Sequence, residues 1–106
     1  MTQKEAIKRL YGINDEIVLK KINALRDNVN EVMDTNWSTL FVLDLLGYFM
    51  MHDNIINLIN NYIAEKDKSN FSKRVDVFLS VVSSNEIIEM ISKFLDIEPK
   101  RIGQKR

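Results

Sequence analysis

Hydrophobic residues recur three and four positions apart along most of the chain, which is the spacing of one face of an α-helix. Together with the capping residues that flank each run, this pattern predicts helices over about 3–11, 15–34, 37–51, 54–65, 71–83 and 86–96. Apolar residues between 75 and 81 also alternate as they do in a β-strand. No second strand candidate is available to pair with that run, so we predict a helix there as well.

Helix ends are marked by recognisable capping residues. Thr2 and Glu5 fit the S/T-x-x-E capping box, and Gly12 stands where a helix often ends in a left-handed residue. Further helix starts are expected at Asn14 or Asp15, at Asp34–Asn36, at Asp53, and at Ser83 with Glu86. The chain contains only three Gly and one Pro, which favours long regular elements joined by short connections.

The segment at about 15–34 has a seam of apolar residues spaced four and three apart. Its members are Val18, Ile22, Leu25, Val29 and Val32. This spacing is typical of a coiled coil, but it lasts only about two heptads, short of the three or four that indicate a true coiled coil. We therefore interpret the segment as an amphipathic helix docked on a bundle.

The segment at about 37–51 is apolar on nearly all sides, which predicts a helix at the centre of a bundle or between two subunits. A membrane span needs about 20 apolar residues. The uninterrupted run from Leu40 to Met51 has 12 residues and contains Asp44, so we predict no membrane association. As candidate protein-interface residues we choose Trp37, Leu40, Phe41, Asp44, Tyr48 and Met51.

These patterns predict an all-α protein, a compact bundle of five or six helices with the helix at about 37–51 at its centre. We expect a single helical domain over residues 1–99 and a basic, flexible tail over residues 100–106. One chain of 106 residues has difficulty covering so apolar a helix. We therefore expect a homodimer that shares the helices at about 15–34 and 37–51.

Few residues are candidates for chemistry. The chain has no cysteine and one histidine, His52, so no zinc-type ligand set is present. His52 with Asp53 or Asp44 is a weak candidate for a metal or acid–base pair, because sequence neighbours point in different directions on a helix. No phosphate-binding glycine loop or nucleophile motif occurs. We predict no enzymatic activity, no catalytic or metal residues, and no cofactor.

The formal charge is zero but unevenly distributed. Residues 1–26 sum to +3, residues 27–65 to −6 and residues 66–106 to +3. A zero total argues against coating of nucleic acid but leaves local basic patches. Two segments, 6–22 and 89–106, partly fit a helix-turn-helix pattern. If that alternative holds, the nucleic-acid contacts are Lys20, Lys21, Lys100, Arg101, Lys105 and Arg106.

The leading functional hypothesis is a non-catalytic regulator or adaptor that binds another protein, because surplus apolar surface occurs without a catalytic cluster. The alternative is a small dimeric DNA-binding transcriptional regulator. The first ten residues lack the apolar stretch of a secretory signal, so we expect a cytoplasmic protein. Abundant Ile, Asn and Lys with scarce Ala suggest an AT-rich genome, such as that of a bacterium, phage, plasmid or virus.

Overall fold

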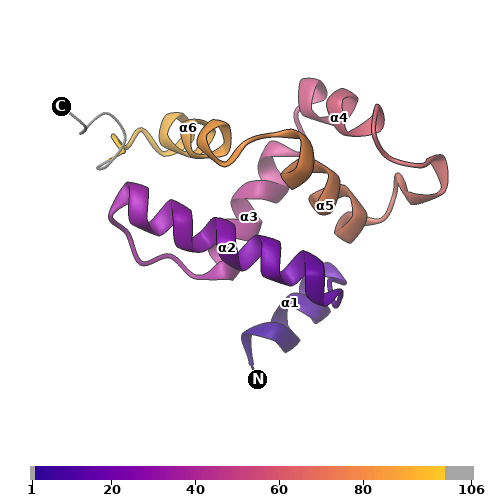
Figure 1. The fold of residues 1–106 in the computed structure, drawn as a ribbon, viewed down its shortest axis with the longest axis horizontal. Helices are drawn as coiled ribbons and strands as arrows, with labels where there is room; N and C mark the ends of the chain where they lie inside the picture. The colour runs from indigo at the N-terminus through magenta and orange to yellow at the C-terminus, as the bar shows by residue number, and fades with distance from the viewer. Residues whose placement is uncertain (1, 100–106) are drawn as a thin grey trace.

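The computed structural model describes residues 2–99, and this part of the chain is all-α (Figure 1). In chain order its elements are α1 (Gln3–Tyr11), α2 (Glu16–Met33), α3 (Thr39–Phe49), α4 (Asp53–Asn60), the 3-10 helix η1 (Glu65–Asp67), α5 (Phe71–Val81) and α6 (Ser84–Leu95). The prediction of a helical bundle is confirmed, and the segment with strand-like alternation is the helix α5. The predicted tail, residues 100–106, lies outside the described residues.

Most of the predicted caps are present. Thr2 Oγ1 accepts a hydrogen bond from the Glu5 amide at 3.1 Å, and the Thr2 amide donates to Glu5 Oε1 at 2.9 Å. Gly12 ends α1 in the left-handed conformation, with φ of 68°. Asp15 caps α2, and Ser83 begins α6 with a second capping box. These local signals therefore fix where three of the six α-helices begin.

The predicted starts of α3 and α4 were wrong. Asp34 adopts a left-handed conformation with φ of 58° and ends α2, so it does not begin the next helix. Ser38 caps α3 by accepting a hydrogen bond from the Phe41 amide at 3.1 Å. His52 is the N-cap of α4 but makes no side-chain capping bond, and Asp53 is already the first helical residue. The N-cap of α3 therefore lies four residues after Asp34, and the N-cap of α4 lies one residue before Asp53.

Other helix boundaries also differ from the prediction, and α3 ends at Phe49 rather than 51. The amide of Asn61 bonds to the carbonyls of both Asn57 and Leu58, which tightens the last turn, and α4 ends at Asn60 rather than near 65. Helix α5 ends at Val81 rather than 83, because Val82 and Ser83 are extended and Ser83 serves as the cap of α6. Helix α6 accordingly begins at Ser84, two residues before the predicted start.

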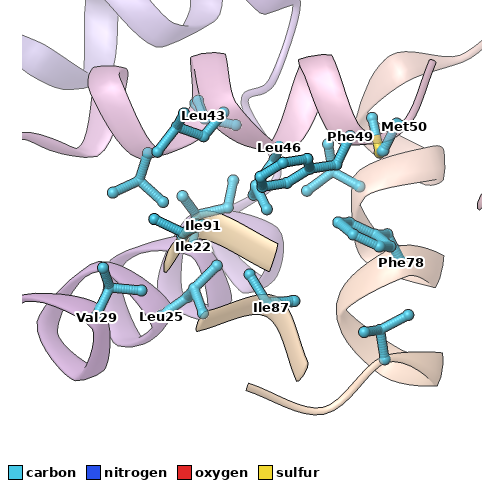
Figure 2. Packing of buried hydrophobic residues seen from close by; sticks show 14 of the residues in the cluster. Ile22, Leu25, Val29, Leu43, Leu46, Phe49, Met50, Phe78, Ile87 and Ile91 are labelled. Atoms are coloured by element: carbon cyan, nitrogen blue, oxygen red, sulfur yellow. The ribbon is translucent and has the colours of Figure 1, made fainter. Parts of the chain in front are cut away.

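The longest helix, α2, packs against α3, α5 and α6, while α1 packs on α3 and α4 on α5. Four of the five residues of its apolar seam are buried and Val32 is partly buried; Ile22 and Val29 are fully inaccessible and face Leu43 and Leu46 of α3 (Figure 2). The interpretation of α2 as a helix docked on a bundle therefore holds. Each such buried aliphatic side chain stabilises the fold by about 1.5–3 kcal/mol. The central position predicted for residues 37–51 is not confirmed, since α2 has the most helical neighbours.

A buried polar cluster joins the first three helices. Thr39 is fully inaccessible and is the one buried polar residue of the described chain. Its hydroxyl donates to Asn23 Oδ1 at 2.8 Å and accepts from Arg26 Nη1 at 2.9 Å. Its amide donates to Gln3 Oε1 at 3.3 Å, and Arg26 also bonds Asp27 at 2.7 Å. The cluster thereby attaches the N-terminus of α3 to α1 and α2.

No single helix within residues 2–99 has the length and hydrophobicity to cross a membrane. Taken together, α3 and α4 reach the required length and composition, but the two helices are bent by 92° at the break between them.

Replacement of Thr39 by Val is expected to lower the free energy of unfolding by about 1–3 kcal/mol, because the side chains of Asn23 and Arg26 lose a buried partner. Urea unfolding followed by circular dichroism measures the loss. The variant Thr39→Ser keeps the hydroxyl and serves as the control, with a smaller loss expected. A Val variant as stable as the wild type would show that the cluster does not hold α3.

The N-terminal capping box predicts a specific pH dependence. Hydrogen bonds from the Thr2 amide, and then from its hydroxyl, lower the pKa of Glu5 below its ordinary value of 4.5. A lowered folded-state pKa means that this stabilisation is complete above 4.5 and is lost as pH falls through the folded-state pKa. Glu5→Gln should therefore reduce the melting temperature at neutral pH, and the difference from wild type should shrink in acid.

The control for this pH experiment is Glu31→Gln, which removes an exposed carboxylate on α2. Thermal unfolding is measured for all three proteins from neutral pH to about pH 2. If the gap between Glu5→Gln and wild type stays constant across this range, the capping box does not contribute through the ionised carboxylate.

Candidate functional site

One side of α3 exposes large apolar side chains around a single carboxylate. Phe41, Tyr48 and Met51 are 37%, 44% and 76% exposed, and Asp44 between them is also exposed. Phe41, Asp44 and Tyr48 are spaced three and four residues apart on one side of α3, and Met51 follows in the turn after the helix. We call these four residues the α3 face. The opposite side of the helix is buried in the core through Val42, Leu43, Leu45, Leu46 and Phe49.

The other two predicted interface residues adjoin the α3 face. Trp37 and Leu40 are half-buried and pack against the core. The Trp37 ring lies 5.1 Å from the Phe41 ring, centroid to centroid, at an angle of 57°. The structure therefore gathers Trp37 and Phe41 at the N-terminal end of α3, with Tyr48 and Met51 at the other end and Asp44 between them.

The segment that carries Trp37 is held by Asn30 of α2. Asn30 Oδ1 accepts hydrogen bonds from the Trp37 amide at 2.8 Å and from the Thr35 hydroxyl at 2.9 Å. Asn30 Nδ2 donates to the Trp37 carbonyl at 3.0 Å. Sequence reasoning missed Asn30, because its partners lie five and seven residues further along in a segment without regular structure.

An aromatic cleft borders the α3 face where α3, α4 and α6 meet. The rings of Tyr48 and Phe94 lie 4.4 Å apart, and His52 meets Tyr48 edge-on at 5.1 Å. The cleft has a volume of about 340 Å³, and its lining also includes Met90 and Lys93 of α6. Phe94 is 46% exposed and was not among the predicted interface residues. The sequence signal for its exposure is its position near the end of the apolar pattern of α6, where other helices no longer cover the side chains.

Asp44 and His52 do not form a reactive pair. Asp44 is exposed and makes no ion pair within residues 2–99, so it lies on the solvent-exposed side of α3. His52 is also exposed and contacts Tyr48. In the part of the chain that the structure describes, no three His, Asp or Glu side chains converge as metal ligands would.

The residues chosen for nucleic-acid contact are only partly described. Lys20 is exposed on α2, whereas Lys21 Nζ forms an ion pair with Asp76 Oδ1 of α5 at 2.6 Å. The remaining four, Lys100, Arg101, Lys105 and Arg106, lie outside the described residues. Asp96 ends α6 with φ of 55°, the left-handed conformation that a turn glycine adopts in a helix-turn-helix. Of the six chosen residues, only Lys20 and Lys21 lie within residues 2–99, and one of these two is paired with a carboxylate. Within the described residues, the chosen positions therefore do not form a basic cluster.

Comparison of the chain with protein-family models, with curated proteins and with solved structures finds no significant match.

Asn30→Ala is expected to release the segment around Trp37. Because Trp37 is the only tryptophan, its fluorescence reports this change directly. We expect a red-shifted emission maximum and a loss of about 1–3 kcal/mol of stability, since three hydrogen bonds to Asn30 disappear. Asn28→Ala, a change on the same helix at a residue without these bonds, is the control. An unshifted spectrum for Asn30→Ala would show that Asn30 does not position Trp37.

Proposed function

We propose that this protein is a non-catalytic binding module, a regulator or adaptor, and that the α3 face is where it contacts its protein partner. The observation that supports this proposal is the exposure of Phe41, Tyr48 and Met51 around Asp44 on a helix whose other side is fully packed. Large aromatic side chains held on a rigid helix are typical of the residues that dominate binding energy in protein interfaces.

The spacing of the face suggests the shape of the partner surface. Side chains three and four residues apart on a helix can be contacted by another helix that lies along it, or by a groove that accepts one side chain per turn. Within α3 the face spans about two turns, from Phe41 to Tyr48, so the matching partner element is a helix of at least that length. Apolar side chains of that helix would cover Phe41 and Tyr48.

Asp44 adds a chemical requirement to the apolar contact. A carboxylate covered by a partner loses its water and needs a hydrogen-bond donor or a cation in return. The partner therefore supplies a Lys, Arg or polar donor opposite Asp44. This pairing gives selectivity, because a purely apolar helix would leave the carboxylate buried without a partner.

Capture experiments from cells of the source organism test the proposal. The tagged protein should retain one dominant partner protein, and Phe41→Ser or Tyr48→Ser should weaken that binding about tenfold or more, because each removes a large anchoring side chain. The matched control is Ile17→Ser, which removes an apolar side chain that is 66% exposed on α2, away from the face. Ile17→Ser should bind like the wild type.

Nuclease treatment and salt titration distinguish protein binding from nucleic-acid binding. Capture through the α3 face should survive nuclease and should fall only modestly as salt rises. Capture that disappears with nuclease, or affinity that falls steeply with salt, would instead favour the DNA-binding alternative. Equal capture by the two face variants and the Ile17 control would also contradict the proposal.

A further inference from the structure

The surface around Tyr48 changes charge from one side to the other. Asp44 and Tyr48 lie four residues apart on one side of α3, and His52, in the turn after the helix, contacts Tyr48 edge-on at 5.1 Å. Lys93 of α6 lines the cleft together with Tyr48 and His52, whereas Asp44, one turn before Tyr48 on α3, does not line it. The surface therefore runs from an acidic group, through aromatic rings, to a basic edge.

The aromatic centre of this surface is incompletely covered. Tyr48 and Phe94 contact each other, yet 44% and 46% of their surfaces remain exposed. Neither Asp44 nor Lys93 forms an ion pair with any residue in the range 2–99. The two half-exposed aromatic rings thus lie between an unpaired anion and an unpaired cation. Such a surface can pair with another one on which a cation faces the anion and an anion faces the cation.

A second copy of the same chain, turned by a two-fold rotation, offers that opposite polarity. With the two-fold axis at the Tyr48–Phe94 pair, the rotation brings Asp44 of each copy opposite Lys93 of the other. The aromatic rings of both copies then cover each other at the centre. An axis through Asp44 would instead place two carboxylates together, which like-charge repulsion disfavours.

We infer that this surface is a homodimer interface, centred on Tyr48 and Phe94 and closed by two symmetric Asp44–Lys93 pairs. The interface differs from the dimer expected from the sequence, which shared α2 with α3, because the seam of α2 is buried inside the chain. It uses α3 and α6. The inference goes beyond the proposed function because it concerns the protein alone and does not require another protein.

A charge swap tests the arrangement with the purified full chain. Sedimentation equilibrium should show a dimer for the wild type. Asp44→Lys and Lys93→Glu should each weaken association about tenfold or more, since each creates two like-charge contacts per dimer. The double variant should recover most of the lost affinity, because the two charges have exchanged places. Tyr48→Ser should weaken the dimer as well, by removing its aromatic centre.

Matched controls separate the interface from general charge effects. Glu31→Lys and Lys20→Glu make the same changes in net charge at exposed positions of α2. They should leave the dimer unchanged, and circular dichroism should show that all variants are folded. A wild-type protein that stays monomeric at all accessible concentrations overturns the inference.

Two other outcomes overturn it equally. A dimer that is insensitive to both single reversals uses a different surface, and a double variant as weak as the single variants shows that Asp44 and Lys93 do not pair across the axis. A monomeric protein that still captures its partner through the α3 face would overturn this inference and leave the proposed function standing.

Discussion

The hydrogen bonds of Thr39 connect the first three helices. The Thr39 hydroxyl is fully buried, and it bonds two side chains of α2 while the amide of the same residue bonds a side chain of α1. Hydrogen bonds are directional, so this cluster fixes the rotation of α3 about its own axis in a way that apolar contacts alone do not. A change in helical register by one residue would turn α3 by about 100°. Such a turn would bring Asp44 toward the core and Val42 or Leu45 toward water.

Helix α2 serves as the scaffold for this arrangement through two adjacent rows of side chains. Ile22, Leu25 and Val29 form the apolar row that packs into the core (Figure 2). Asn23, Arg26 and Asn30 follow each of these residues by one position, so they form a parallel polar row along the edge of the same helix. The polar row binds Thr39 and the segment around Trp37. One helix thus supplies both the hydrophobic packing and the hydrogen bonds that orient α3.

Local signals in the sequence were sufficient for much of the fold. The Thr2–Glu5 box and Gly12 depend only on residues within one or two turns, and the apolar seam of α2 follows from its spacing alone. The start of α3 could not be read in the same way. Asn30 holds Trp37 across seven residues of irregular chain, and Ser38 rather than Asp34 then becomes the cap.

The candidate site shows the same division between local and tertiary information. Trp37, Phe41, Asp44, Tyr48 and Met51 could be chosen because their segment had more apolar surface than a helix edge needs. Which of these residues are exposed, however, depends on which side of α3 faces the core, and the Thr39 cluster helps to set that orientation. The contact of Phe94 with Tyr48 could not be predicted from the sequence, because it depends on how α6 crosses the end of α3.

Asp44 is the residue through which the fold and the proposed binding are connected. A carboxylate on an otherwise apolar helix strongly disfavours any packing that buries it without a partner, so it helps to keep the α3 face outward. The same carboxylate limits what can cover that face, since an approaching surface must offer a cation or a donor. On the dimer inferred here, Lys93 of the second copy meets this requirement, and another protein must supply its own group to replace it. Because Tyr48 belongs to both proposed surfaces, the inferred dimer and a bound partner would exclude each other, and under the two proposals partner binding is expected to depend on the concentration of the protein itself.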